Sequence, residues 1–257
     1  MKAKTTHKTP AIVLRTLDYG ESDRIVTFYT ADFGKIKGIA KGARRSQRRF
    51  ANTLEPFSCI TILFSKKDDA SLAFLENSDI IDHYAAIRAD LEKTLQASYL
   101  VDLTDQFTLE GKANYLLFES IKDFLKLIDE GHASDTLLRF FEMRLLKYSG
   151  YEPVLDRCTV CQKPVNELKT CRFNFRDGGI NCDHCRNGSF DGLSLSLGTV
   201  KSLLLGKDMD LTKIHRLSLS PQTAQESKTL LAGFIRHLLG KELKSAHVLN
   251  QIRRLGI

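Results

Sequence analysis

The sequence predicts an α+β fold: a small five-stranded β-barrel, then an α-helical domain with an inserted metal-binding segment. Three observations lead to this prediction. Segments rich in β-branched and aromatic residues fill the first third of the chain, and apolar residues then recur at intervals of three and four. Two Cys-x-x-Cys pairs interrupt this second region. We expect the barrel domain at residues 1–82 and the helical domain at 83–257, with the metal-binding segment at about residues 155–190.

The strands of the barrel are predicted from their composition and from the turns between them. Residues 20–22 (Gly-Glu-Ser) suit a turn between the first two strands, and residues 66–70 (KKDDA) suit a polar turn before the last one. Five short antiparallel strands in so few residues are typical of an oligonucleotide-binding (OB) barrel. The predicted strands are residues 11–19, 24–30, 33–42, 57–64 and 71–77.

The helices are predicted from apolar periodicity and from residues that suit helix ends. Glycines at positions 111, 131 and 150 lie where three successive helices would end. Pro221 suits the first turn of a later helix that Ser220 would cap. The predicted helices are residues 87–110, 113–131, 133–150, 195–206, 221–240 and 245–255.

A basic cluster at residues 35–50 (KIKGIAKGARRSQRRF) is the most informative segment of the predicted barrel. No Asp or Glu occurs from Phe33 to Leu54, so the sequence neighbourhood leaves these charges unneutralised. Such a cluster indicates an anionic partner, and a solvated loop without a ligand is the alternative. The candidate DNA-binding residues are Lys35, Lys37 and Lys41 on one strand face, Arg44, Arg45, Arg48 and Arg49 on the loop that follows, and Arg15 and Arg24 on neighbouring strands.

The net charge of the whole chain is +7, and its distribution also favours a polyanion. Residues 1–83 contain 14 Lys and Arg against 10 Asp and Glu, whereas residues 84–157 contain 9 against 13. Residues 158–257 contain 15 against 8, but these cations are scattered. Scattered cations can belong to a solvated face, to a second DNA contact or to a surface for an acidic peptide.

Four of the six cysteines form the pairs Cys158–Cys161 and Cys182–Cys185. Two such pairs separated by twenty residues suit one tetrahedral Zn²⁺ ion, because each pair presents two thiolates. Residues 172–180 would form a hairpin that carries the second pair. Four thiolates close the coordination shell, so we expect one structural zinc ion. Two separate redox dithiols, or His184 in place of one thiolate, remain alternatives, and Cys59 and Cys171 look structural.

No motif of a known catalytic machinery is present, so we expect a protein that is not an enzyme. The sequence lacks a G-x-S-x-G elbow, a phosphate-binding P-loop and a dinucleotide fingerprint. It also lacks the H-x-E motif of the zinc deaminases. No apolar run is long enough to cross a membrane and no signal peptide is recognisable, which predicts a cytoplasmic protein. A zinc-containing OB-fold factor that binds RNA is the alternative function, and a nuclease is a further rival class.

Several motifs together resemble the bacterial recombination-mediator family RecO. They are VLRTLDYGESDRIVTFYTADFGKIKGIAKGARR at residues 13–45, LEPF at 54–57, LDRCTVCQK at 155–163 and DGGINCDHC at 177–185. The resemblance implies an OB-fold barrel joined to a helical, zinc-binding domain, with zinc on Cys158, Cys161, Cys182 and Cys185. It also implies binding of single- and double-stranded DNA, annealing of complementary strands, and repair by the RecF pathway. The implied partners are RecR, the acidic tail of single-stranded-DNA-binding protein (SSB) and, indirectly, RecA, at the nucleoid and not at a membrane.

Overall fold

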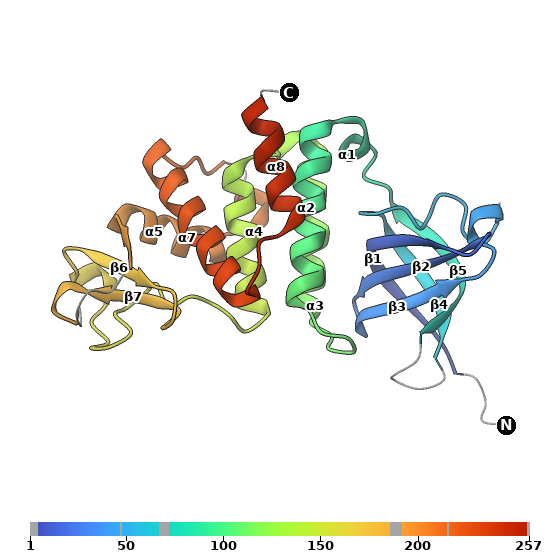
Figure 1. Cartoon of the computed structure of the whole chain (residues 1–257), viewed down its shortest axis with the longest axis horizontal. Helices are drawn as coiled ribbons and strands as arrows, with labels where there is room; N and C mark the ends of the chain where they lie inside the picture. Colours follow the sequence, from blue (N-terminus) through green and yellow to red (C-terminus); the bar gives the residue numbers. More distant parts are fainter. Residues whose placement is uncertain (1–4, 47, 67–71, 186–191, 215, 256–257) are drawn as a thin grey trace. The chain divides into compact units, whose positions relative to one another are not determined.

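The computed structural model describes residues 5–46, 48–66, 72–185, 192–214 and 216–255. The chain divides into two compact units, which we describe separately (Figure 1). The first unit comprises Met1–Gly131 and Val248–Ile257, and the second comprises His132–His247. In the described residues, no helix combines the length and the apolar character that a membrane crossing requires.

A closed five-stranded barrel forms the N-terminal part of the first unit, in the order β1-β2-β3-β5-β4. The predicted OB-type barrel is therefore confirmed, with one correction. Strand β3 pairs with β5 in parallel, whereas the other neighbouring pairs are antiparallel as expected. Of the turn predicted at residues 66–70, residues 67–70 lie outside the described residues. The strands are β1 (Thr6–Tyr19), β2 (Asp23–Thr30), β3 (Gly34–Ala40), β4 (Cys59–Ser65) and β5 (Ala73–Asp82).

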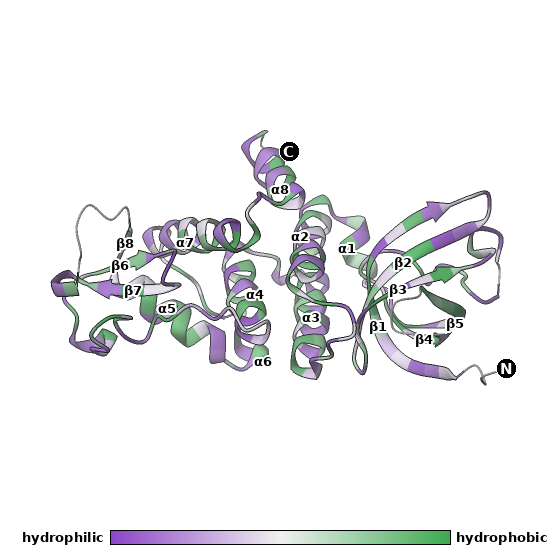
Figure 2. Ribbon diagram, turned by 60° about the horizontal axis from the view of Figure 1, so that its bottom comes forward, coloured by the Kyte–Doolittle hydropathy of each residue, from purple (hydrophilic) through white to green (hydrophobic). Residues whose placement is uncertain are grey.

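Alternating side chains fill the barrel, as the sequence pattern requires. Val26 and Phe28 of β2 and Ile36 and Ala40 of β3 point inward and are buried, whereas Lys37 between them is exposed. Figure 2 shows hydrophobic and hydrophilic stretches along the barrel strands. The lysines of β3 are consequently held on the outer face of the barrel.

Three helices follow the barrel in the first unit: α1 (Ala85–Ala89), α2 (Leu91–Phe107) and α3 (Tyr115–Leu127). The helix predicted at residues 87–110 is wrong at its start, because Asp90 breaks it. The backbone of Asp90 is extended, and its carboxylate accepts a hydrogen bond from the Lys93 amide at 2.9 Å as the cap of α2. A π turn, Ile128–His132, closes this region.

The second unit contains a helical group and a small sheet. Its helices are α4 (Asp135–Tyr148), α5 (Leu197–Asp208), α6 (Leu211–Ile214) and α7 (Pro221–Leu239). Ser220 caps α7 and Pro221 lies in its first turn, as predicted. Helix α8 (Lys244–Leu255) begins in this unit and ends in the first one. The sheet has the order β7-β6-β8, with β6 (Cys171–Asn174), β7 (Gly179–Cys182) and β8 (Leu193–Leu195).

Candidate nucleic-acid interface and metal centre

The loop after β3 carries most of the predicted DNA-binding cations. Strand β3 ends at Ala40, so Lys41 lies in the turn that follows and not on the strand face where the sequence predicted it. A short 3-10 turn, η1 (Ala43–Arg45), continues the loop. Ala43, Phe50 and Leu54 are buried in the barrel core and anchor it. The exposed side chains are those of Lys41, Arg44, Arg45, Arg48 and Arg49.

Hydrogen bonds fix this loop against its neighbours. The amide of Gly42 donates to the Asp23 carboxylate at 2.8 Å, and the amide of Arg44 donates to the Ser22 carbonyl at 3.0 Å. Further along, the amide of Ser78 donates to the carbonyl of Arg49 at 3.0 Å. These hydrogen bonds tie Gly42 and Arg44 to the turn between β1 and β2, and Arg49 to β5.

Four of the predicted cations are paired with acids from distant parts of the sequence. Lys35 Nζ lies 3.1 Å from the Asp105 carboxylate and donates to the Asp105 carbonyl at 2.6 Å. Its side chain is only 13% exposed. Lys37 pairs with Glu110 at 2.8 Å, which raises the pKa of Lys37 and lowers that of Glu110. The sequence interpretation of an unneutralised cluster is wrong for these two lysines.

Arg24 and Arg44 form a second paired group at one end of the barrel. Arg24 contacts Glu55 at 2.9 Å and Asp18 at 3.2 Å, and these contacts raise its pKa; the hydrogen bond that Arg24 donates to Glu55 is the largest cause. Arg44 also forms an ion pair with Asp18, with its Nε 3.5 Å from the carboxylate. Two guanidinium groups thus face two carboxylates. In the described residues, Lys41, Arg45, Arg48, Arg49 and Arg15 form no ion pair with a carboxylate.

Sequence reasoning missed these acids because they lie far from the cluster along the chain. Asp105 is 70 residues from Lys35, and the backbone approach that joins them depends on Gly34. Gly34 has φ +64°, and a Cβ there would lie 2.2 Å from the Lys112 carbonyl oxygen. Charge alternation in the sequence contained no signal for this contact.

The four paired cysteines come together in the second unit. Their Sγ atoms all lie within 4.8 Å of one another, and all four are free thiols. In the described residues they are the single group of three or more Cys, His, Asp or Glu side chains that can share one ion. His184 does not belong to this group, although it lies between Cys182 and Cys185.

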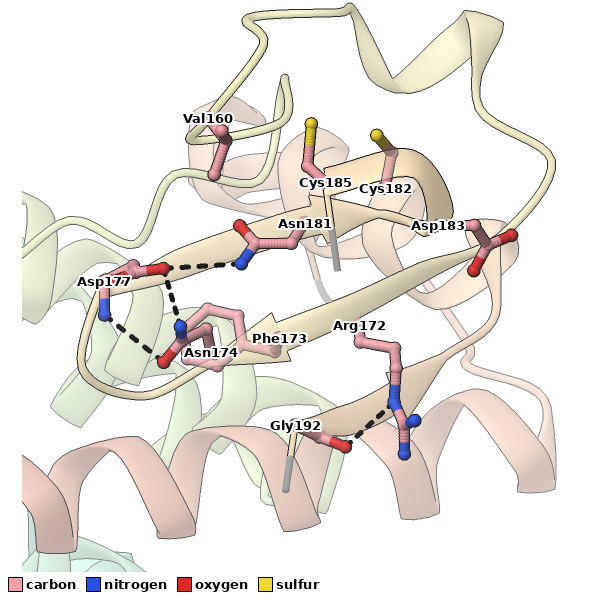
Figure 3. Close-up of a pocket in the computed structure, with 10 residues that line it drawn as sticks. All are labelled: Val160, Arg172, Phe173, Asn174, Asp177, Asn181, Cys182, Asp183, Cys185 and Gly192. Atoms are coloured by element: carbon pink, nitrogen blue, oxygen red, sulfur yellow. Dashed lines mark hydrogen bonds between the residues drawn. The ribbon is translucent and has the colours of Figure 1, made fainter. Parts of the chain in front are cut away.

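Backbone pairing places the first cysteine pair beside the second. Strands β6 and β7 form the predicted antiparallel hairpin, which ends at Cys182. The segment before Cys161 lies along β7, because the Val154 amide donates to Gly178 and the Thr159 amide donates to Ile180, both at 2.9 Å. Figure 3 shows Cys182 and Cys185 at this end of the hairpin.

The sulfur geometry fits a tetrahedral metal ion. A Zn–S bond of about 2.3 Å implies neighbouring sulfurs about 3.8 Å apart. The Sγ atoms of Cys161 and Cys182 are 3.8 Å apart, far longer than a disulfide bond of about 2.05 Å. The residues therefore fit one metal ion held by four thiolates.

Backbone amides stabilise the thiolate form of Cys158, the form that binds a metal cation. Burial alone would raise the pKa of Cys158, but amides of Cys161, Cys182 and Val160 donate to its sulfur and lower the pKa to about 6. The pKa of Cys185 is raised to about 12, mainly by hydrogen bonds with the Cys161 and Cys182 sulfurs. Four thiolates this close can all be ionised only when a cation compensates their charge.

A pocket of about 240 Å³ lies beside the second cysteine pair. Polar side chains of the β6–β7 hairpin line it, and Figure 3 shows Asp177 joined to Asn174 and Asn181 across the turn. Arg172 donates to the Gly192 carbonyl at 3.1 Å on its other side. These bonds rigidify the hairpin that carries Cys182.

The fold and the cysteine cluster define a class: two-part proteins with an OB-fold barrel followed by a helical region with four cysteines that can hold a metal ion. Family models match both parts of this architecture. The model "Recombination protein O N terminal" matches residues 1–84, and "Recombination protein O C terminal" matches residues 88–247. The chain belongs to the RecO family of DNA repair proteins.

Named relatives are similar over nearly their whole length. The DNA repair protein RecO of Syntrophus aciditrophicus (strain SB) is 50% identical over 259 residues, covering 100% of both chains. The RecO of Geobacter metallireducens is 37% identical over 246 residues, covering 95% of this chain and 97% of the relative. The RecO of Bacillus pumilus is 34% identical over 248 residues, covering 96% of this chain and 95% of the relative.

Proposed function

We propose that this chain is a recombination mediator that binds single- and double-stranded DNA without sequence specificity and anneals complementary strands. The observation that carries the proposal is the loop after β3, whose cations Lys41, Arg45, Arg48 and Arg49 are exposed and form no ion pair with an acid in the described residues. Guanidinium groups hold phosphates bidentately, and such contacts ignore base identity. The DNA-binding domain would be residues 1–82.

The paired cations have a different role in this proposal. Lys35 and Lys37 hold the segment around Asp105 and Glu110 against the barrel, and Arg24 and Arg44 tie the barrel end to Asp18. Because these acids balance their charges, the paired cations would not be the main phosphate contacts. Arg15 lies on the outer face of β1 in the same cross-strand row as Lys37 and is a secondary contact.

The family supports the partners that we propose. With RecR, the chain would help to load RecA on single strands coated with SSB, in RecF-pathway repair at the nucleoid in the cytoplasm. The exposed cations of α7 and α8, among them Arg236 and Lys244, would suit the acidic tail of SSB. Zinc is the metal that we propose for Cys158, Cys161, Cys182 and Cys185, where it would cross-link the two cysteine pairs. We propose no catalytic activity for the chain.

Strand annealing tests this function. Complementary DNA strands, naked or coated with SSB, would be mixed with the wild type and with the variant Arg45→Gln/Arg48→Gln/Arg49→Gln. A control variant, Lys126→Gln/Lys163→Gln/Lys169→Gln, removes the same charge from surfaces outside the loop. We expect the wild type and the control to anneal and the loop variant to lose at least about tenfold in rate. Equal annealing by the loop variant, or tighter binding of RNA than of DNA of equal length, would contradict the proposal.

A further inference from the structure

The four cysteines of the metal centre differ in how far the fold shields their sulfurs. Cys158 is fully buried, and its sulfur accepts a hydrogen bond from the Cys182 amide at 3.4 Å. Cys182 is also buried, whereas Cys185 is half-buried and Cys161 is exposed. The pocket beside the second pair is lined by Cys182 and Cys185, and Figure 3 shows both side chains at the same end of the hairpin. Small solutes can therefore reach part of the cluster.

Exposure and ionisation together decide how readily a cysteine is oxidised. A thiol that binds a metal ion is deprotonated, so a zinc-bound Cys161 is a thiolate at the protein surface. Cys59 and Cys171 lie outside the cluster and are each only 1% exposed. Cys161 is therefore the first of the six cysteines that an oxidant in solution would meet.

A second sulfur lies close enough to complete a disulfide with Cys161. The Sγ atoms of Cys161 and Cys182 are 3.8 Å apart, so they need to approach by about 1.8 Å to reach the length of an S–S bond. An exposed thiolate beside a resolving cysteine is the usual arrangement of a redox sensor. This disulfide would remove two of the four ligands, and structural zinc is held by all four. Oxidation would therefore release the metal.

The backbone around the cluster has contacts that do not depend on the metal. The disulfide would join the same two segments that a metal ion joins, namely the loop that carries Cys161 and the end of β7. Hydrogen bonds from the Val154 amide to Gly178 and from the Thr159 amide to Ile180 also hold these segments together. The oxidised chain would therefore remain folded, and a thiol reductant could restore the metal site.

We infer that the four-cysteine centre is a peroxide-sensitive switch, in which Cys161 and Cys182 form a disulfide and zinc is released. The Cys161 thiolate attacks one oxygen of hydrogen peroxide, the O–O bond breaks, and a sulfenic acid and a hydroxide form. The Cys182 thiolate then attacks the sulfenic sulfur, so that the S–S bond forms and a second hydroxide leaves. The two thiolates lose two electrons to the peroxide, and two protons from the solvent convert the hydroxides into water. The inference rests on the proposed zinc and not on the proposed DNA contacts.

The test follows zinc and the six thiols during oxidation. The zinc-loaded wild type would be treated with hydrogen peroxide, zinc release would be measured with a chromogenic chelator, and disulfides would be mapped by differential alkylation and mass spectrometry. The variant Cys161→His keeps a ligand, because three cysteines and one histidine also form structural zinc sites, but it cannot form the disulfide. The control Cys171→Ala removes a buried thiol that pairs with Cys182 in the sheet but lies outside the cluster. The disulfide map of the wild type is a readout that does not depend on either variant.

We expect the wild type and the control to release about one zinc ion per chain as Cys161 and Cys182 become a disulfide. Cys59 and Cys171 should stay reduced in the wild type. The variant Cys161→His should release zinc at least about tenfold more slowly. A dithiol reductant with added zinc should restore the bound metal, and circular dichroism should show the same helix content before and after oxidation.

Several results would overturn the inference. It fails if the zinc-loaded wild type keeps its metal in excess peroxide, if the metal leaves without a disulfide between Cys161 and Cys182, or if Cys161→His loses zinc as fast as the wild type. Irreversible unfolding of the oxidised chain would show that the centre is damaged and not switched. If the purified wild type holds no zinc, the proposed metal fails together with the inference, whereas retention of zinc in peroxide leaves the proposed metal in place.

Discussion

Removing the unpaired arginines of the loop should flatten the salt dependence of DNA binding. Each phosphate that a cation neutralises on a single strand adds about −0.7 to the slope of log K against log salt. Lys41, Arg45, Arg48 and Arg49 are the exposed loop cations that form no ion pair with an acid in the described residues. Four contacts therefore give an expected slope of about −2.8 for the wild type.

The variant Arg45→Gln/Arg48→Gln/Arg49→Gln keeps one of these cations, and its slope should fall to about −0.7. A fourfold rise in salt would then weaken binding about fiftyfold in the wild type but only about threefold in the variant. Fluorescence anisotropy of a labelled oligothymidine over a series of salt concentrations measures both slopes.

A charge-conserving variant sharpens this test. Replacing the same three arginines by lysine keeps the charges and should keep the slope near −2.8, because counterion release depends on charge. The reasoning would be refuted if the glutamine variant kept the wild-type slope. It would be refuted equally if the lysine variant behaved like the glutamine variant.

Three further predictions concern stability and the metal. Cys182→Ser should abolish stoichiometric zinc binding, measured by atomic emission, and should lower the melting temperature, while the protein that remains folded still anneals DNA. If the variant lost annealing but kept full zinc content and full stability, the site would not be structural. Gly34→Ala should destabilise the chain by about 2 kcal/mol or more in denaturant unfolding, because the new Cβ would meet the Lys112 carbonyl. Gly20→Ala should cost less, because φ is also positive there but no atom lies within 4 Å of the new Cβ. Burial would raise the pKa of Glu226, but hydrogen bonds that Thr199 and Ser196 donate to its carboxylate lower this pKa to about 2. The stability advantage of wild type over Glu226→Gln should therefore be complete above about pH 4.5 and decline as pH falls toward 2; a gap independent of pH would refute this.

Local patterns in the sequence were sufficient to predict the barrel strands and the longer helices, but not α6 or β8. Alternation of charged and apolar residues around Ile36 placed β3, and Ser220 followed by Pro221 placed the start of α7. The break at Asp90 was missed because apolar periodicity continues across it, whereas the cap depends on one side-chain hydrogen bond. The parallel pairing of β3 with β5 was missed because it is set by barrel closure and not by either strand.

The candidate sites show the same division between local and distant contacts. The spacing of the cysteines was enough to predict that the four thiols meet. The pairing of Lys35 with Asp105 was invisible, since it depends on how α2 reaches the barrel.

Protection of arginines from chemical modification tests most directly whether the loop holds the DNA backbone. The protein would be treated with an arginine-specific dicarbonyl, with and without saturating oligothymidine, and the modified sites would be quantified by mass spectrometry. Arg45 and Arg48 are expected to be protected by DNA, whereas the exposed Arg157 near the cysteine pairs should react equally in both samples. Equal modification of Arg45 and Arg48 with and without bound DNA would show that the strand lies elsewhere.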